Sequence, residues 1–338
     1  MINALQHVGM GVNDTDTTYA FYRDTLGFKI KLNDHTEYSQ EMAPIIGDVV
    51  EMRMLMAMNI HGGGAIELIE HTSTEPRARA EPVRWGDLGF LESGLWATNL
   101  DALVPQLQAK GVALLTPVCS FQDYAGATWK YAYLRDPDGL LLQLLERPGS
   151  DGASLVGGIS HVAVGVSDIE AAERFYGEVL GYDRAIYRFT GYLPEMDAVT
   201  GGPVRMKMTI LERSQGSTSQ LALLDGGLIK LVQAIGYQGR PIFEGRRWGD
   251  IGQMEVALDV TDLRVTLDEA LSKGATLLHP PTFMDMGSGS VGSFAYITDP
   301  DGNIIEFVEV EKIAWVSPQV MSSVLIRALK LLAKMKVL

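Results

Sequence analysis

The chain has 338 residues, which is enough for two ordinary domains with a core each. Hydrophobic residues make up 46% and charged residues 21%, and the formal charge of -14 would repel nucleic-acid phosphates. The single cysteine, Cys119, excludes an internal disulfide framework, and no apolar run reaches the length of a membrane span. The N-terminal segment lacks the features of a signal peptide, so we expect a cytoplasmic protein. From the negative charge we expect that it does not bind nucleic acid.

The first long repeat in chain order covers residues 5–29 and 159–183, which match without a gap. Each copy begins with an alternating strand, passes an Asp or Ser cap, and continues as an amphipathic helix with a Phe-Tyr pair. A Leu-Gly pair then ends the helix. The pattern predicts the same strand-helix unit twice.

A second repeat covers residues 84–103 and 247–267, and it again predicts a strand followed by a helix. These helices end in Lys-Gly pairs, and each is followed by the phrase DPDG between two apolar strands, at residues 133–147 and 296–311. Asp-Pro opens a turn, and the glycine accepts a positive φ and reverses the chain. The phrase therefore predicts a hairpin whose second strand alternates between two faces.

These repeats predict four α+β modules, over residues 1–75, 86–148, 157–236 and 249–312. We expect them to form two domains, over residues 1–148 and 157–312. The C-terminal stretch 317–338 reads as a basic amphipathic helix. We expect it to pack on the acidic body of the protein or on a partner subunit of a homodimer, rather than on a membrane surface.

The repeated phrases resemble the vicinal oxygen chelate superfamily, which includes glyoxalase I, methylmalonyl-CoA epimerase, extradiol dioxygenases and bleomycin resistance proteins. The resemblance rests on the H-V-x-x-x-V-x-D/S strand, the FY-x-x-x-L-G helix and the D-P-D-G-x-x-x-E/Q ending, and it spans about residues 1–312. It implies an α+β fold of four βαβββ modules in tandem, with curled mixed sheets around a cavity.

The resemblance also implies a metal site whose ligands come from the first and last strands of the modules. The residues at the matching positions are His7, Glu67, Glu92, Gln143, His161, Lys230, Glu255 and Glu306. Without the resemblance, each of these residues would be interpreted as an ordinary polar residue on a strand. We expect the ligands to be His7, Glu67, Glu255 and Glu306, and the catalytic residues to be Glu306, Glu67 and Tyr296.

Which modules share the site is left open by the repeats. Modules one and four would collect the ligand set just given, whereas modules three and four would place His161 and Lys230 beside Glu255 and Glu306. An ammonium group close to a divalent ion is repulsive, which favours the first pairing. On this interpretation the glutamate after the DPDG turn of module four, Glu306, indicates the metal site. Gln143 at the same position of module two indicates a module in which the site is lost or weakened.

One imidazole with carboxylates and no thiolate suits a single divalent ion of Fe, Mn, Co, Ni or Zn. The resemblance then implies an enzyme that chelates adjacent oxygens of a small substrate, most simply a glyoxalase-like or epimerase-like isomerase or lyase. The alternative is an Fe(II) extradiol dioxygenase. The segment YITDPDGNIIE resembles the ending Y-x-x-D-P-x-G-x-x-x-E of those enzymes, with Tyr296 at the tyrosine position. However, the histidine expected upstream is absent from MGSGSVGSFA.

A third possibility is a metal-free binding or resistance protein with an aromatic groove. Its candidate lining residues are Tyr124, Trp129, Tyr131, Phe283 and Phe294. Aromatic residues on strands mostly pack in a core, so this lining is the weaker interpretation of them.

Overall fold

The computed structural model describes residues 1–38, 40, 42–78, 83–150, 152–287 and 289–313, and six residues beyond them (318, 320, 323, 324, 327 and 328). The predicted C-terminal helix therefore lies mostly outside the described residues, and its packing and the homodimer stay predictions. Within the described part of the chain, no helix has the length and apolar character needed to cross a membrane.

Four βαβββ modules follow one another along the chain, as the sequence predicts. Module one comprises β1 (Ile2–Gly11), α1 (Thr15–Asp24), β2 (Ile30–Tyr38), α2 (Ala43–Ile46), β3 (Glu51–Met58) and β4 (Ala65–His71). Module two comprises β5 (Gly89–Thr98), α3 (Leu100–Ala109), β6 (Cys119–Gln122), β7 (Thr128–Arg135) and β8 (Leu141–Glu146). Module three comprises β9 (Leu155–Gly165), α4 (Ile169–Arg174), the π-helical η1 (Phe175–Val179), β10 (Arg184–Tyr192), η2 (Pro194–Met196), α5 (Asp197–Thr200), β11 (Arg205–Glu212) and β12 (Leu228–Ala234). Module four comprises β13 (Gly252–Val260), α6 (Leu263–Ser272), β14 (Thr276–Gly287), β15 (Ser290–Thr298) and β16 (Ile304–Lys312).

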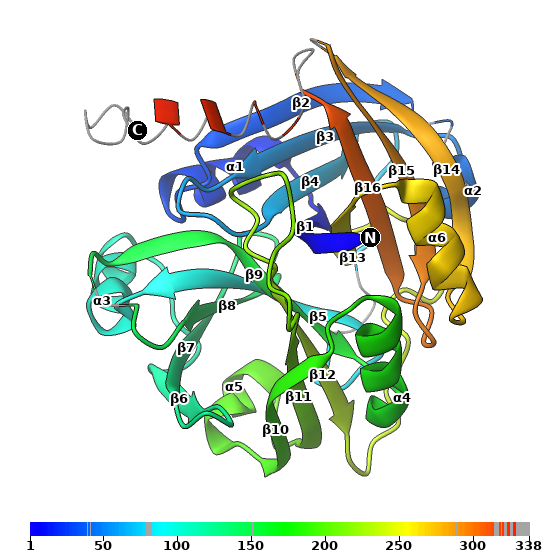
Figure 1. The fold of residues 1–338 in the computed structure, drawn as a ribbon. Coiled ribbons are helices and arrows are strands. Elements are labelled where there is room, and N and C mark those ends of the chain that lie inside the picture. Colours follow the sequence, from blue (N-terminus) through cyan, green and yellow to red (C-terminus); the bar gives the residue numbers. More distant parts are fainter. Residues whose placement is uncertain are drawn as a thin grey trace.

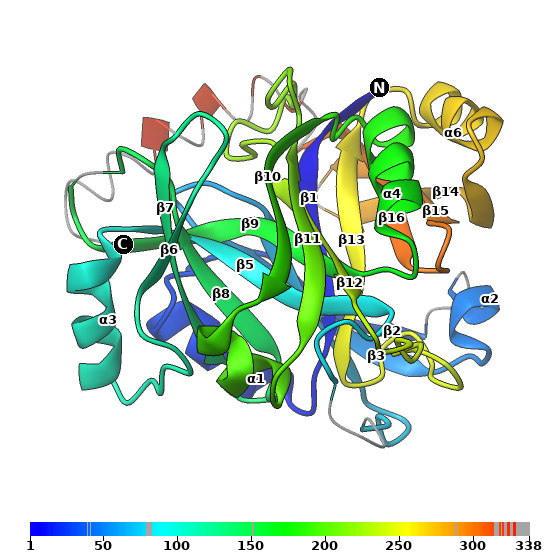
Figure 2. The same cartoon turned by 90° about the horizontal axis from the view of Figure 1, so that it is seen from below.

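The strands form two curled, mixed sheets of eight strands. Sheet A has the order β14-β15-β16-β13-β1-β4-β3-β2, and sheet B has the order β10-β11-β12-β9-β5-β8-β7-β6. Sheet A therefore unites modules one and four, drawn in blue and in yellow to orange, and sheet B unites modules two and three (Figure 1). The first strands β1 and β13 join antiparallel at the centre of sheet A and lie side by side in Figure 2.

Each sheet thus takes one module from each half of the chain. Of the two pairings that the sequence left open, the structure contains the pairing of modules one and four. The division of the chain into domains over residues 1–148 and 157–312 stays a prediction.

The side chains on the two faces of each sheet have different neighbours. A large apolar core joins the helix-covered faces of both sheets and includes residues of all four modules, such as Tyr22, Leu134, Tyr176 and Leu258. The opposite face of each sheet, here called the inner face, carries its own smaller cluster. Because side chains alternate along a strand, residues two apart share a face, and this places the candidate ligands of sheet A away from the helices.

The helix boundaries follow local signals in the sequence. Asp14 caps α1 by accepting a hydrogen bond from the Thr17 backbone N–H at 2.7 Å, and Asp168 caps α4 in the same way from Ala171 at 2.9 Å. At the Leu-Gly stop after α1, Gly27 has a φ of 86°, a conformation in which a side chain would be strained.

The two DPDG turns tie consecutive modules together. In the turn of module two, Asp136 accepts a hydrogen bond from the Tyr22 hydroxyl of α1 at 3.2 Å. In the turn of module four, Asp299 accepts one from the Tyr176 hydroxyl of η1 at 3.0 Å. The tyrosine of each Phe-Tyr pair therefore connects its module to the next one along the chain, although the two modules belong to different sheets.

Candidate metal centre

Two rows of paired residues bring the candidate ligands together at the centre of the inner face of sheet A. One row runs across β1, β13 and β16 through His7, Ala257 and Glu306. The other runs across β4, β1 and β13 through Glu67, Gly9 and Glu255. All four predicted ligands therefore lie in two adjacent rows of one sheet face, around the junction of modules one and four.

The atoms of this cluster approach one another closely. His7 Nε2 lies 3.3 Å from Glu306 Oε2 and 3.5 Å from Glu67 Oε2, and ligand atoms of His7, Glu67 and Glu255 all lie within 4.8 Å of one another. The side chain of His7 is 3% exposed, whereas those of Glu306 and Glu67 are 9% and 13% exposed, and Glu255 is fully buried. The cluster is therefore buried, and it opens most at Glu67.

Small residues alternate with the ligands in both rows and leave room for their carboxylates. A Cβ atom at Gly9 would lie 2.6 Å from Glu255 Oε1, closer than atoms can approach without a shift. Glycine at this position therefore lets the Glu255 carboxylate extend across β1 towards the other ligands.

Neighbouring side chains orient the ligands. The Gln6 side-chain oxygen lies 2.9 Å from His7 Nδ1, so an N–H at Nδ1 donates to it and Nε2 faces the carboxylates. The indole N–H of Trp248 donates to Glu255 Oε2 at 2.7 Å. Sequence reasoning assigned no role to Gln6 and Trp248, although the repeated phrase RWGD, which contains Trp248, was a signal that could have pointed to the tryptophan.

Tyr296, the third predicted catalytic residue, pairs with Glu306 across β15 and β16 and is buried. Its hydroxyl interacts with the Glu306 carboxylate. His279 on β14 pairs with Tyr296 in turn, and its ring stacks on Phe294 at 5.5 Å between ring centroids. An imidazole that sequence reasoning did not consider thus lies beside Tyr296, on β14 and outside the segment in which a histidine was expected.

The charges in the cluster shift one another's pKa values. Burial by itself lowers the pKa of His7, but the interactions with Glu67, Glu306 and Glu255 outweigh it and raise the pKa to about 9. Burial raises the pKa of Glu306 to about 7, with the charge of His7 opposing the shift. Burial, together with the charges of Glu306 and Glu67, raises the pKa of Glu255 well above its usual range. The raised pKa values of Glu255 and Glu306 mean that the three carboxyl groups cannot all ionise easily beside a single imidazolium.

The residues present fit a divalent metal ion. His7 Nε2 and Glu255 Oε1 are buried and have no hydrogen-bond partner among the described residues. Buried carboxylates are costly unless a cation compensates them, and one imidazole nitrogen with carboxylate oxygens is a donor set that borderline divalent ions accept. His7, Glu67, Glu255 and Glu306 would hold such an ion.

The matching positions of sheet B hold a lysine instead. His161 Nε2 lies 3.0 Å from Glu92 Oε1, and the ammonium group of Lys230 pairs with the same oxygen. Lys230 also donates to the Gln143 side-chain oxygen at 2.8 Å. These side chains are almost completely buried, and an internal ammonium group compensates the carboxylate of Glu92. His161, the alternative ligand, therefore lies in a different sheet from Glu255.

The aromatic residues considered for the groove of a metal-free binding protein do not lie together. Tyr124, Trp129 and Tyr131 lie on or beside β6 and β7 of sheet B, where Trp129 and Tyr131 are buried in its inner cluster. Phe283 and Phe294 lie on β14 and β15 of sheet A. The two groups therefore lie in different sheets, on the two outermost strands at one end of each.

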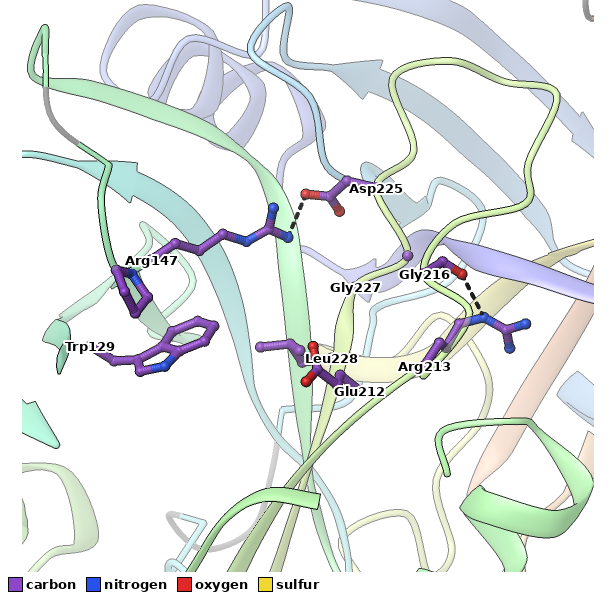
Figure 3. Close-up of a pocket in the computed structure, with 10 residues that line it drawn as sticks. Trp129, Arg147, Glu212, Arg213, Gly216, Asp225, Gly227 and Leu228 are labelled. Carbon is purple, nitrogen blue, oxygen red and sulfur yellow. Dashed lines mark hydrogen bonds and ion pairs between the residues drawn. The ribbon is translucent and has the colours of Figure 1, made fainter. Parts of the chain in front are cut away.

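Two pockets lie apart from the cluster. One, of about 320 Å³, opens beside Trp129, and its charged walls are paired internally: Arg147 contacts Asp225 at 2.8 Å, and Arg213 donates to the carbonyl oxygen of Gly216 (Figure 3). The other, of about 450 Å³, lies beside Trp85. No candidate ligand of sheet A is among the described residues that line either pocket.

Comparison with known families identifies the family to which the chain belongs. Residues 4–144 and 158–307 each match the family described as the Glyoxalase/Bleomycin resistance protein/Dioxygenase superfamily. The chain therefore belongs to this superfamily, with two copies in tandem. A comparison with curated proteins finds no match.

Solved structures show the same fold at low sequence identity. Glyoxalase I from Zea mays is 17% identical, with 91% of this chain and 92% of that chain covered and a TM-score of 0.57. A candidate dioxygenase from Bacillus subtilis is 14% identical, with 95% and 90% covered and a TM-score of 0.57. These two structures carry different chemistries, so the likeness establishes the fold and leaves the reaction to be argued from the site.

Proposed function

We propose that the chain is a divalent-metal-dependent enzyme that binds a small molecule through two adjacent oxygens and moves a proton on it, as a glyoxalase-like or epimerase-like isomerase or lyase does. The supporting observation is the convergence of His7, Glu67, Glu255 and Glu306 on one buried spot of sheet A. When bound, a divalent ion supplies a Lewis acid that polarises a carbonyl oxygen.

The three carboxylates have different surroundings, which suggests different roles. Glu255 is fully buried and its Oε2 accepts a hydrogen bond from Trp248, so it serves as a fixed ligand. The side chains of Glu67 and Glu306 are 13% and 9% exposed, more than that of Glu255, and they lie on opposite sides of His7, on β4 and β16. One can take a proton from the substrate while the other returns one, and the Tyr296 hydroxyl orients Glu306 during this exchange.

Exchange of carbon-bound hydrogen with deuterated water tests this proposal. The protein is loaded in turn with Mn, Co, Ni, Zn and Fe(II) and incubated with α-hydroxy ketones and hemithioacetals, and deuterium incorporation is followed by NMR. Glu67→Gln and Glu306→Gln should each slow the exchange by about 10²-fold or more. Glu37→Gln, on β2 of the same sheet, is the matched control and should leave the rate unchanged. No exchange with any metal would overturn the proposal.

A second candidate function is ring cleavage by an Fe(II) dioxygenase, favoured by the position of His279 beside Tyr296. Oxygen uptake by the Fe(II)-loaded protein with a catechol separates the two functions. Uptake that is lost in His279→Ala, without deuterium exchange in the first experiment, would support the dioxygenase. Metal analysis separates both from a metal-free binding protein.

A further inference from the structure

The larger of the two pockets, here called the junction pocket, takes its wall from all four modules. Its volume of about 450 Å³ lies within the range of about 300–1,000 Å³ that is usual for small-molecule sites. Asn13 comes from module one, the turn 138–141 from module two, Val199 from module three, and Ile251 and Gln253 from module four. The junction pocket therefore lies at the boundary between the two sheets.

The inner part of the junction pocket is apolar. Trp85, Leu91, Leu141 and Val199 line it and are buried, and all four belong to the apolar cluster on the inner face of sheet B. The indole N–H of Trp85 donates to the sulfur of Met206 at 3.2 Å, which holds the ring in the wall. Water in such a space makes few hydrogen bonds, so its displacement by an apolar group is favourable.

One polar side chain interrupts this apolar wall. Gln253 is 2% exposed, and its side-chain N–H donates to the backbone oxygen of Leu141 at 3.2 Å. Because that bond requires the amide nitrogen, the other end of the amide is the oxygen. Gln253 Oε1 is buried and has no hydrogen-bond partner in the described part of the chain. A buried acceptor without a partner destabilises the protein unless a bound molecule supplies a donor.

The other copy of the repeat shows that the fold does not require a polar residue here. Gln253 corresponds to Phe90, since residues 247–255 match residues 84–92. Phe90 is 1% exposed and packs in the large core. An apolar side chain therefore suits this position, and the glutamine of module four has an acceptor for which the described residues supply no donor.

We infer that the junction pocket is a second binding site, which takes a small, largely apolar molecule with one hydroxyl or N–H group. The apolar body of the molecule lies against Trp85 and Leu91, and its O–H or N–H donates to Gln253 Oε1. At the mouth, the exposed Arg135 and the half-buried Asp138 carry opposite charges, so the entrance favours neither an anion nor a cation. The site is separate from the candidate metal centre and does not depend on the proposed function.

A further cation contacts the backbone of the wall. Arg246 Nη2 donates to the backbone oxygen of Ile251 at 2.5 Å, and Arg246 Nε and Nη1 are buried without a partner among the described residues. Arg246 is not one of the described residues that line the junction pocket. A ligand with an added carboxylate is therefore included in the test, because it shows whether this arginine takes part in binding.

Three related ligands test the inference with binding as the readout. Indole and 1-benzofuran have nearly the same shape, and only indole has an N–H donor. NMR titration of the full-length protein should show indole bound about 2- to 10-fold more tightly, the contribution of one hydrogen bond. Indole-3-carboxylate should bind no more tightly than indole. Equal affinities for indole and benzofuran, or no binding of either, would overturn the inference. Tighter binding of the carboxylate that is lost in Arg246→Gln would overturn the uncharged ligand class.

Two variants locate the bound molecule. Gln253→Leu removes the acceptor at similar volume and should abolish the preference for indole over benzofuran, whereas Gln122→Leu, exposed on β6, should leave it unchanged. Val199→Trp fills the pocket and should weaken both ligands by at least about tenfold. Its control is Val265→Trp, at an exposed position of α6. If Val199→Trp does not fold, Gln253→Leu still decides, because a preference for indole that survives this variant would contradict the site.

Metal loading separates this site from the metal centre. No candidate metal ligand is among the described residues of the junction pocket, so the affinity for indole should be the same with and without a bound divalent ion. An affinity that appears only after loading with Zn or Mn would place the ligand at the metal centre and overturn the inference. Failure of the protein to bind metal would leave the expected result with indole unchanged.

Discussion

Single residues distinguish the candidate metal site of sheet A from the corresponding position of sheet B. The sheets carry a histidine at the same position, as His7 and His161, and a glutamate at another, as Glu255 and Glu92. They differ at the remaining two positions, where sheet A has Glu67 and Glu306 and sheet B has Lys230 and Gln143. The lysine supplies inside the protein the positive charge that a divalent ion would supply in sheet A.

Trp248 should matter for metal affinity although it is not a ligand. Replacing it by phenylalanine removes the hydrogen bond to Glu255 Oε2 and leaves the ring volume largely in place. Partners of this kind typically contribute about 10- to 100-fold in metal affinity. We expect Trp248→Phe to weaken the binding of Zn or Mn by such a factor in a competition titration with a chelator.

The control for this variant is Trp85→Phe, at the same position of the other repeat. The Trp85 indole N–H donates to the Met206 sulfur and does not contact a candidate ligand. Its replacement should leave metal affinity unchanged, and equal losses in both variants would show that Trp248 acts only through stability.

Lys230 should stabilise the fold through its buried ion pair. Lys230→Met leaves the carboxylate of Glu92 buried with only the hydrogen bond to His161, whose pKa burial lowers to about 4, and breaking such an ion pair typically costs about 3–5 kcal/mol. Urea unfolding should show a loss of this size. Lys207→Met removes the exposed ion pair with Glu170 and should cost about 1 kcal/mol or less. Similar small losses in both variants would contradict a structural role for Lys230.

At the scale of elements, the DPDG turns were predictable and their partners were not. The sequence indicates the turn, because proline and glycine fix its backbone, and Gly302 has the expected positive φ of 84°. That Asp299 also accepts a hydrogen bond from Tyr176, more than a hundred positions earlier, depends on how modules pack. Local patterns carry no information about such contacts.

Tyr176→Phe should destabilise the protein by weakening the contact between η1 of module three and the DPDG turn of module four. Asp299 Oδ2 loses the Tyr176 donor but keeps the Asn303 side-chain donor at 2.8 Å, and the loss of one such hydrogen bond typically costs about 0.5–1.5 kcal/mol. Thermal or urea unfolding checks this loss. Tyr192→Phe is the control, since the Tyr192 hydroxyl donates to Asp197 at the surface and should contribute less than about 0.5 kcal/mol. A loss of unfolding free energy no larger than that of the control would show that the contact between modules three and four does not depend on this hydrogen bond.

At the scale of the whole molecule, the sequence predicts the four modules and their βαβββ order but leaves their partners open. The opening strands β1, β5, β9 and β13 are all buried and similar in pattern, so each can pair with another at the centre of a sheet. The structure joins β1 to β13 and β5 to β9. The argument from charge favoured this arrangement because Lys230 would otherwise stand beside the carboxylates of Glu255 and Glu306.

The inner faces were less predictable than the candidate ligands. The positions of the candidate ligands follow from repeats and alternation. Gln6 contacts His7 at an irregularity in the pairing of β1 with β13, His279 is placed by its pairing with Tyr296, and Trp248 lies in the segment before β13. The methionine face of β3 is visible in the sequence as EMRMLMAM, but its proximity to Glu67 requires the strand order.

Metal content after reconstitution tests the central claim most directly, namely that one ion is held in sheet A by His7 and its neighbours. Wild-type protein, His7→Ala and His161→Ala are each exposed to excess metal, separated from unbound ions and analysed by mass spectrometry of the elements. The account predicts about one ion per chain in the wild type and in His161→Ala, and a large loss in His7→Ala. Retention of the ion in His7→Ala together with its loss in His161→Ala would place the metal in sheet B and contradict the account.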